Sequence, residues 1–522
     1  MLLFTVLSSL CWARLTAASL PGIAPPSQPN LSPKVLKITN GIVAPDGFNR
    51  SAILVNGKYP SPLITWKKVR FTILSKSLNS NPAQGSKYQI NVENGLTDPT
   101  MERGTSIHWH GFFQKGTNYA DGPVGVSQCP IAPRNSFLYE FTANDQAGTY
   151  WYHSHFAAQY CDGLRGPFVV YDDNDPLRFL YDVDNENTVI TVAEWYHTPS
   201  PSILNIPLSH TTLINGKGRA ENGPAVPLSV INVERLKRYR IRLVSVACEP
   251  NFLFSIDNHP FLVIEVDGQN IVPYSADQIQ IFAGQRYSFV IFANQKVDNY
   301  WIRALPNIGR GDLPANFNRG INSAILRYKG AKEVEPTSWQ KKSGKLLEES
   351  ELHPLLLDAR APGAPHAGGA DVNINLDITI DWDSLRFLVN NVSYWAPNVP
   401  ILLQILSGAK TAQELLPSGS IFTLPRNKVI EVTVPGGAAV GPHAFSVIRS
   451  AGKNAKANYK NPVRRDVVSI GDIGSNVTIR FTTDNAGPWL FHCHIEFHLD
   501  AGLAVVFAED PGNTDVAVQP TG

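Results

Sequence analysis

The 522-residue sequence has little charge, few cysteines and no long hydrophobic run. Charged residues make up 17% of the chain, and 45 basic against 44 acidic residues leave a net charge of +1. Because a basic surplus is missing, we expect no nucleic-acid partner. Five cysteines in so long a chain exclude a small disulfide-stapled fold. No stretch reaches about 18 uncharged apolar residues, so we expect no membrane-spanning helix and no membrane partner.

What the sequence does contain indicates a large β-rich protein. Hydrophobic residues are 43% and aromatic residues 10% of the chain, which suits a large buried core. At roughly 150 residues per domain, the length predicts about three domains. Short runs rich in β-branched residues recur between turn residues, as at 88–92, 168–171, 239–244 and 429–434. Such runs are typical of β-sandwiches, and the sequence therefore predicts an all-β fold.

The first residues predict a secretory signal. An apolar run from Met1 to Ala13 is too short to span a bilayer, and small residues follow at 16–19. We predict a signal peptide over residues 1–19; the alternative is a buried first strand or helix. Sequons, which fit a glycoprotein secreted to the extracellular space, occur at Asn30, Asn49, Asn391 and Asn476.

Two polar, turn-rich stretches divide the rest of the chain. They lie at 172–176 and at about 330–369. We predict domains at 20–172, 173–345 and 346–522. The first and last of these each contain a His-x-His motif followed by Gly-Leu and paired valines, which indicates an internal repeat of one domain type.

Three His-x-His pairs are the chemical signal of the sequence. Residues i and i+2 of a strand point to the same face, so each pair presents two imidazoles together. A single pair is better explained as structural, but three pairs in β context favour a metal site. Imidazole binds copper, iron or zinc, and several pairs can build a polynuclear site. The six residues are His108, His110, His153, His155, His492 and His494.

The third pair encloses a cysteine, Cys493. On a strand its thiol would point away from the face of His492 and His494, and His498 could return to the cysteine's side. A thiolate with imidazole and a weak or missing axial ligand is the blue-copper arrangement. One segment could thus hold a blue copper on one face and a copper cluster on the other. The alternative is a buried structural cysteine beside incidental histidines.

These motifs resemble the copper signatures of fungal laccases, which belong to the multicopper oxidases. Residues 108–114, His-Trp-His-Gly-Phe-Phe-Gln, together with Ala-Asp-Gly-Pro at 120–123, resemble the first signature. Trp-Tyr-His-Ser-His at 151–155 resembles the second signature, and His-Cys-His-Ile-Glu-Phe-His at 492–498 resembles the fourth. Thr-Leu-Ile-Asn-Gly-Lys-Gly-Arg at 212–219 is also typical of the family.

The resemblance spans about 35–510 and implies three cupredoxin-like Greek-key β-sandwich domains with copper as cofactor, four per chain in the family. His108 would bind the single copper of a trinuclear cluster. Cys493 and His498 would hold the blue copper, and Leu503 in its axial position should raise the potential, because leucine cannot coordinate Cu(II). The paired coppers of the cluster would be bound by His110, His153, His155, His492 and His494.

The resemblance also implies roles for three carboxylates and one cysteine pair. Glu249 follows Cys248, where laccases place an acid that hydrogen-bonds a phenolic hydroxyl; the alternative is an ordinary exposed carboxylate. Asp121 would assist proton delivery to oxygen, and Glu496 would help. Cys161 and Cys248 match the disulfide that bridges the first two domains of the family.

The chain departs from the family at the third copper signature, His-Pro-x-His-Leu-His-Gly-His. Residues 441–447 read Gly-Pro-His-Ala-Phe-Ser-Val, so one histidine remains of four and about seven residues of the motif are missing. His443 either takes the blue-copper position or aligns with the last, non-ligating histidine. In both cases at least two cluster ligands have no substitute, and we expect oxygen reduction to fail or to be very slow. We interpret five other histidines as structural or surface residues: His197, His210, His259, His353 and His366.

Two further departures accompany this gap. Near 68–84 the chain holds an insert that the family pattern lacks. Our hypothesis is that the insert is an unspliced intron translated in frame and that the gap is a second gene-model error. The alternative is that both the insert and the gap are real. The chain stops at Gly522 without the family's cysteine-containing tail, which leaves Cys129 without its partner.

The leading prediction is a secreted, monomeric laccase-type oxidase. It would oxidise phenols or aromatic amines by single electrons and reduce O2 to water, chemistry used in lignin degradation, pigment formation and detoxification. Alternatives are a ferroxidase or ascorbate-oxidase relative and, from another class, a non-catalytic copper-binding relic. A zinc hydrolase is disfavoured, because no open three-ligand site with a general base is evident.

Overall fold

The computed structural model describes most of the chain, and its regular secondary structure is almost entirely β-strand, so the all-β prediction is confirmed. The predicted signal peptide, Asn30, His443 and nearly all of the insert near 68–84 lie outside the described residues. The residues that the structure describes are 34–68, 87–143, 146–203, 208–307, 316–339, 344–356, 359–436, 444–445, 457–471 and 474–514.

The first region, about 35–171, is a sandwich of two four-stranded sheets. One sheet has the order β2-β1-β4-β6 and comprises β1 (Val35–Val43), β2 (Arg50–Val55), β4 (Lys87–Asn94) and β6 (Ser136–Thr142). The other has the order β3-β8-β7-β5 and comprises β3 (Ile64–Lys67), β8 (Arg165–Tyr171), β7 (Gly148–His153) and β5 (His108–His110). Apolar residues of both sheets form one core. Two short 3-10 helices, η3 (Asn118–Ala120) and η4 (Ala157–Asp162), lie between the strands.

The second region is the largest sandwich. Its six-stranded sheet β10-β9-β12-β17-β14-β15 contains β9 (Val189–Trp195), β10 (Thr211–Ile214), β12 (Arg238–Ser245), β14 (Phe261–Val266), β15 (Gln269–Ala276) and β17 (Arg286–Phe292). Its five-stranded sheet β11-β19-β18-β13-β16 contains β11 (Val230–Val233), β13 (Asn251–Ile256), β16 (Gln278–Ile281), β18 (Asn299–Asn307) and β19 (Ser323–Tyr328). The 3-10 helices are η5 (Arg178–Leu180), η6 (Glu186–Thr188), η7 (Ser200–Ser202), η8 (Asn318–Gly320) and η9 (Glu349–Glu351).

The third region has smaller sheets. They are β20-β24-β27, β21-β22, β23-β29-β28 and β25-β26, made of β20 (Val372–Asn375), β21 (Ile378–Asp381), β22 (Arg386–Val389), β23 (Ile421–Leu424), β24 (Val429–Pro435), β25 (Ala444–Phe445), β26 (Val468–Ser469), β27 (Asn476–Thr482), β28 (Gly487–His492) and β29 (Ala504–Glu509). Two short helices, α1 (Ile401–Leu406) and α2 (Glu496–Asp500), flank them. Cys493 and Leu503 lie in the core between these sheets.

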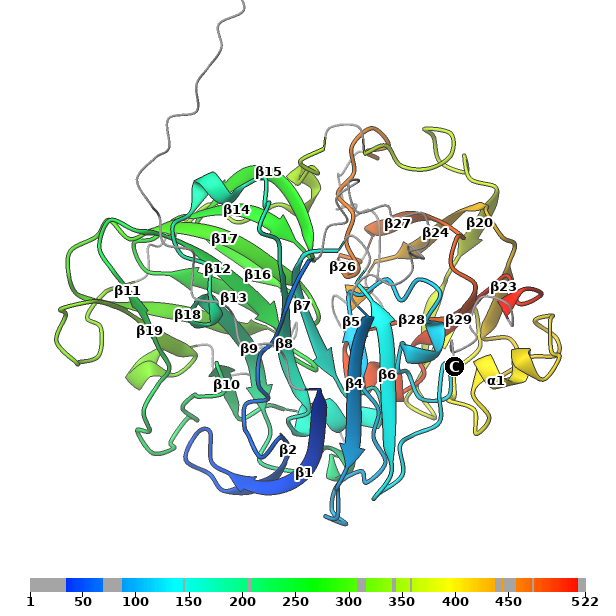
Figure 1. Ribbon diagram of the computed structural model, residues 1–522, viewed down its shortest axis with the longest axis horizontal. Helices are drawn as coiled ribbons and strands as arrows, with labels where there is room; N and C mark the ends of the chain where they lie inside the picture. Colours follow the sequence, from blue (N-terminus) through cyan, green and yellow to red (C-terminus); the bar gives the residue numbers. More distant parts are fainter. Residues whose placement is uncertain are drawn as a thin grey trace, which may run out of the picture.

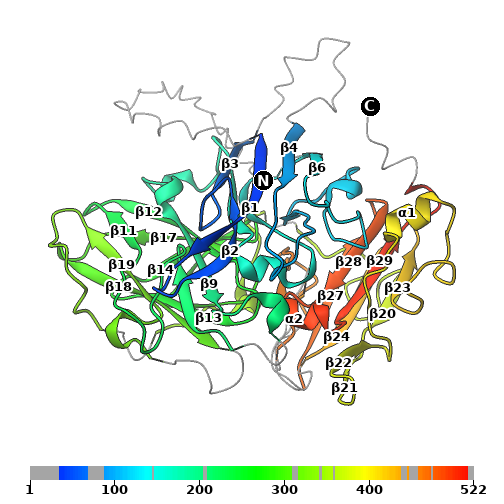
Figure 2. The same cartoon turned by 90° about the horizontal axis from the view of Figure 1, so that it is seen from below.

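The first region lies between the other two. Figure 2 shows its blue and cyan strands between the green second region and the yellow-to-red third region. Strand β7 marks this junction, because all six of its residues are buried. Alternate residues of a strand face opposite ways: Tyr150 and Tyr152 enter the first core, whereas Trp151 joins a cluster shared with the second region. Strand β7, which lies between β8 and β5 in its sheet (Figure 1), is therefore packed on both of its faces.

A disulfide closes the same junction. Cys161 of η4 is bonded to Cys248 of the second region, with their Cα atoms 5.7 Å apart, which confirms the predicted pairing. Cys129 is exposed and forms no disulfide within the described part of the chain.

Candidate metal centre

The six histidines of the three His-x-His pairs converge where the first and third regions meet. Strand β5 pairs with β7 so that His108 lies opposite His153. Strand β28 ends at His492, beside the loop that carries His155. Ring centroids are 5.3 Å apart for His108 and His153, 5.1 Å for His155 and His492, and 4.9 Å for His110 and His494. The structure thus brings together the histidines that the sequence places up to 386 residues apart.

The nitrogens of these rings face one another. Nε2 of His155 lies 3.4 Å from Nε2 of His492, and Nδ1 of His110 lies 3.1 Å from Nε2 of His494. Nε2 of His153 is buried and has no hydrogen-bond partner among the described residues. A buried polar atom without a partner is costly, and converging lone pairs repel. A metal ion bound among them would relieve both penalties.

Backbone carbonyls fix the tautomer of three rings. The Nδ1–H groups of His108, His153 and His492 donate to the carbonyl oxygens of Asp121 (2.7 Å), Ser154 (2.7 Å) and Cys493 (2.8 Å). A carbonyl can only accept, so the proton is on Nδ1 and the lone pair is on Nε2. An outer hydrogen bond of this kind is the usual support of a metal-binding histidine.

Burial keeps most of these imidazoles neutral, which is the form that binds a metal. It lowers the pKa of His110 to about 3 and that of His492 to about 4. It also lowers the pKa values of His153, His155 and His494 well below the ordinary value. Burial also acts to lower the pKa of His108. The carboxylate of Asp121 lies 3.4 Å from its Nδ1 and outweighs burial, so the pKa of His108 is raised.

The thiol of Cys493 lies on the other side of the same segment. It is buried, and its Sγ is 3.7 Å from Nδ1 of His498 in α2. Leu503 is fully buried in the same core and accepts the backbone N–H of Cys493 (3.1 Å). The ring of Phe387 packs on His498 at 4.7 Å. His443, the third predicted residue of this site, lies outside the described residues.

The three predicted carboxylates take different positions. Asp121 lies beside His108, as given above. Glu496 is buried in the first turn of α2, and this burial raises its pKa well above the ordinary value. Glu249 is half-buried and accepts a hydrogen bond from the hydroxyl of Tyr196 (3.0 Å).

Two of the histidines interpreted as structural, His197 and His259, have partners outside the cluster. His259 is buried between the carbonyl of Asp257 and the hydroxyl of Tyr328, each 2.7 Å away. Nε2 of His197 lies 2.8 Å from a carboxylate oxygen of Asp46. Both are accounted for by contacts outside the cluster.

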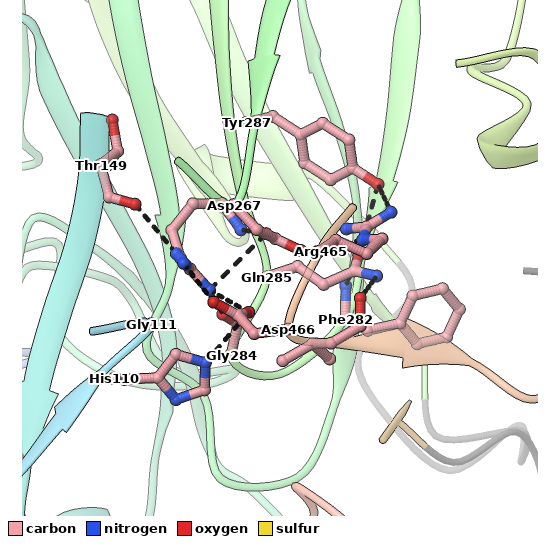
Figure 3. Close-up of polar contacts among 12 residues, drawn as sticks. His110, Gly111, Thr149, Asp267, Phe282, Gly284, Gln285, Tyr287, Arg465 and Asp466 are labelled. Atoms are coloured by element: carbon pink, nitrogen blue, oxygen red, sulfur yellow. Dashed lines mark hydrogen bonds and ion pairs between the residues drawn. The ribbon is translucent and has the colours of Figure 1, made fainter. Parts of the chain in front are cut away.

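Sequence reasoning missed a carboxylate at the cluster. One oxygen of Asp466 lies 3.4 Å from Nε2 of His110, and the same carboxylate forms a two-point ion pair with Arg286 (Figure 3). The available signal was its setting, because the charged run Arg464-Arg465-Asp466 is enclosed by Val463 and Val467, both of which are buried. Charges that a buried apolar segment carries inward are expected to have buried partners.

The donor set suits copper. Imidazole is a good ligand for copper, and a thiolate beside imidazole is the kind of donor pair that would hold a blue copper. The unpartnered Nε2 of His153 and the facing nitrogens of the other rings fit a metal cluster. The described residues therefore offer six imidazoles on one face of segment 492–494 and a thiolate with an imidazole on the other.

Family models of multicopper oxidases match three consecutive parts of the chain, at 37–175, 186–331 and 394–513. Laccase-4 of Trametes villosa is 53% identical over 497 residues, covering 93% of this chain and 91% of that protein. A laccase of Phlebia radiata is 53% identical, covering 96% and 93%. Laccase-2 of Pleurotus ostreatus is 55% identical, covering 91% and 88%.

Solved structures agree with these matches. The laccase of Botrytis aclada superposes with a TM-score of 0.76 at 28% identity, covering 93% of this chain and 89% of that one. Fet3p, a multicopper oxidase that functions in iron import, superposes with a TM-score of 0.76 at 27% identity, covering 93% of each chain.

Proposed function

The chain belongs to the multicopper oxidases and, within them, to the laccases, and on that premise we propose roles for its residues in a laccase-type reaction. Phenols or aromatic amines each lose one electron near Cys493 and His498, and O2 is reduced to water among the six histidines. Copper, when bound, supplies the one-electron chemistry that couples these two half-reactions.

One observation carries this proposal: Cys493 stands between two cluster histidines in an unbroken segment. The carbonyl of Cys493 accepts the Nδ1–H of His492 at 2.8 Å, so a hydrogen bond as well as the peptide chain joins the thiol to the cluster. The same segment thus supports both a site that takes electrons from substrate and a site that delivers them to oxygen. A merely structural cysteine would not need six converging imidazoles behind it.

On the substrate side, Glu249 is the proposed proton acceptor. A phenol becomes much more acidic as it loses an electron, so its hydroxyl proton needs a base close to the oxidising site. The carbonyl of Cys248 accepts the N–H of Glu496 at 2.9 Å, which ties the residue before Glu249 to helix α2 and hence to His498. Tyr196 fixes the carboxylate by its 3.0 Å hydrogen bond.

On the oxygen side, reduction to water consumes protons, and two carboxyl groups are placed to hold them. Burial raises the pKa of Glu496 well above the ordinary value and so favours its protonated form. Asp121 lies beside His108, where its oxygen is 3.4 Å from Nδ1. We assign both residues to proton supply.

We propose that the missing third signature limits the rate of O2 reduction. The six histidines of the other signatures are in place, but at least two family ligands have no counterpart in the sequence, so we propose that O2 reduction is slow. A non-catalytic relic that holds one copper near Cys493 is the second candidate, and the same gap favours it.

Restoring the signature separates these two functions. A variant with Pro-Phe-His-Leu-His-Gly-His inserted after His443 should consume O2 in the presence of a phenol at least about a hundredfold faster than the unaltered chain. As a control, the same insertion combined with His108→Ala should remain slow. If the unaltered chain already matches the insertion variant, the gap does not impair it; if neither consumes O2, the laccase assignment of this chain's activity is wrong.

Secretion is a further part of the proposal. In the described part of the chain, no helix is long and apolar enough to cross a bilayer. The sequon residues Asn49, Asn391 and Asn476 are all exposed, as glycosylation requires. Expression in a eukaryotic host should give protein in the medium whose electrophoretic mobility increases after treatment with an N-glycosidase. Protein found only inside the cells would contradict secretion.

A further inference from the structure

His110 is oriented differently from its neighbours in the cluster. His108, His153 and His492 each bind a backbone carbonyl through Nδ1, which leaves Nε2 with the lone pair. In His110 the order is reversed, because Nδ1 faces Nε2 of His494 at 3.1 Å. Its Nε2 lies 3.4 Å from a carboxylate oxygen of Asp466, an ion-pair contact that falls short of hydrogen-bond geometry. A carboxylate can only accept, so Asp466 favours the tautomer with the proton on Nε2 and the lone pair on Nδ1.

Asp466 is itself held rigidly. Its two oxygens accept from the two terminal nitrogens of Arg286 at 2.5 and 2.6 Å, a bidentate geometry (Figure 3). Arg286 is fully buried, and its remaining donors bind the carbonyls of Thr149 and Gly284, each at 3.0 Å. This guanidinium cannot rotate away without leaving buried donors unpaired.

The surrounding charges complete the network. Asp267 lies 3.7 Å from Arg286 and is bound at 2.8 Å by Arg465, the residue before Asp466. Arg465 also forms a 2.8 Å ion pair with Glu349. Asp466 is thus fixed both by its own partner and by its neighbour in the chain.

Two glycines allow this close approach. A Cβ on Gly111, the residue after His110, would lie 2.4 Å from a terminal nitrogen of Arg286 and 2.8 Å from Asp466. A Cβ on Gly284 would lie 2.8 Å from His494 and 3.1 Å from His110. Both positions also have positive φ, at 92° and 82°, which glycine adopts without strain. The backbone leaves room for these contacts and for little else.

We propose that Asp466, anchored by Arg286, is a positioning residue that holds His110 with Nδ1 toward the cluster and so strengthens copper binding there. His110 belongs to the first region, Asp466 belongs to the third region, and Arg286 belongs to the second region. The proposal rests on the proposed function only in the identity of the metal, since the orientation of the ring is a property of the chain alone.

The matched control is a second buried aspartate–arginine pair. Arg303 donates to both oxygens of Asp257 at 2.8 Å, inside the second region. Asp257→Ala removes a similar buried carboxylate and should cost similar stability, but neither residue contacts the cluster histidines in any contact that the structure describes. The conservative variant Asp466→Asn keeps an oxygen that can accept from Nε2 of His110.

The first test is copper retention by the full chain during titration with a copper chelator. Asp466→Ala should lose cluster copper at about ten- to hundredfold lower chelator concentration than the unaltered chain. Asp466→Asn should recover most of this loss, and Asp257→Ala should behave like the unaltered chain. The blue absorption of the Cys493 site serves as an internal reference that should not change. Equal retention by Asp466→Ala and the unaltered chain, or equal loss in Asp257→Ala, would overturn the proposal.

The second test needs no copper. In metal-free protein labelled with 15N-histidine, and with His110 assigned by His110→Gln, the His110 ring should show the Nε2–H tautomer. Asp466→Ala should abolish that preference and Asp466→Asn should keep it. A His110 signal of the Nδ1–H form in the unaltered chain would refute the proposal, even if the chain bound four coppers. Conversely, if the chain binds no cluster copper but His110 shows the Nε2–H form, the proposed function is contradicted and this inference is supported.

Discussion

The second region differs from the two regions that flank it. It has the largest sheets and core, yet none of the predicted copper ligands lies in it. The first region supplies His108, His110, His153 and His155, and the third supplies a segment that carries four more, 492–498. The second region instead supplies residues that contact the ligands or the proposed substrate site.

The difference separates two tasks, binding the metal and shaping the space around it. Gly284 packs against His110 and His494, Arg286 anchors Asp466, and Glu249 with Tyr196 stands at the proposed substrate side. These residues lie at the edge that faces the first and third regions. On these proposals, a domain without ligands contributes to ligand orientation and to proton transfer.

The largest expected effect lies in the third region, at the thiol. In the chain with the restored third signature, Cys493→Ser should abolish the blue absorption and lower phenol oxidation at least about a thousandfold, because a hydroxyl cannot replace the thiolate–copper bond. Absorption spectra and initial rates of phenol oxidation measure both effects. The matched control is Cys129→Ser, which should change neither. A blue band that survives in Cys493→Ser would remove the third region from the electron-accepting role.

The next largest effect tests the link between the first and second regions. Replacing Cys161 and Cys248 together by alanine should lower the free energy of unfolding by about 3 kcal/mol, since the bond closes a loop of 87 residues. Denaturant titration followed by fluorescence measures the change. The unaltered chain under reducing conditions should show the same loss, and Cys129→Ala should show none. An unchanged midpoint would mean that packing alone holds the two regions together.

A smaller effect concerns the second region's share in substrate oxidation. In the chain with the restored third signature, Glu249→Gln should lower kcat/KM for a phenol by about a hundredfold, because the proton acceptor is lost. Ferrocyanide, which has no proton to give, should be oxidised as before. The exposed Glu221→Gln serves as the matched control. Equal losses for phenol and ferrocyanide would show that Glu249 acts on the electron-accepting site rather than on the proton.

The smallest effect is confined to the third region, at Glu509. Burial raises its pKa from 4.5 to about 8, so the unfolded chain ionises at lower pH than the native chain. The native state therefore loses stability as pH rises from about 4.5 to about 8. Glu509→Gln should remove this loss and be more stable than the unaltered chain by about 1–2 kcal/mol at pH 8, with no gain at pH 4. Thermal unfolding at both pH values measures it, with the exposed Asp383→Asn as control; equal gains at both values would contradict the assignment.

Local patterns in the sequence were enough to predict the β fold and the cluster histidines. The period of two in His-x-His depends only on strand geometry, and the pairing of His108 with His153 follows once β5 and β7 are neighbours. The laccase resemblance added the Cys161–Cys248 disulfide, which spacing alone does not specify. The predicted boundaries at 172–176 and 330–369 and the roles of the site residues remain predictions.

Contacts between distant segments could not be predicted in this way. Asp466 and Arg286 are 180 residues apart, and His110 is farther still, so no local period relates them. The need for glycine at 284 depends on two rings that arrive from other regions. Tyr196 and Glu249 likewise meet only through the packing of two loops. Such residues become visible only when the tertiary structure places them together.

The most direct test of the central claim is the number of copper ions that the purified chain retains after gel filtration, measured beside Cys493→Ser. We predict more than one copper per chain, with a blue absorption that disappears in Cys493→Ser while cluster copper remains. A chain that retains no copper, or a single copper that both proteins hold equally, would contradict it.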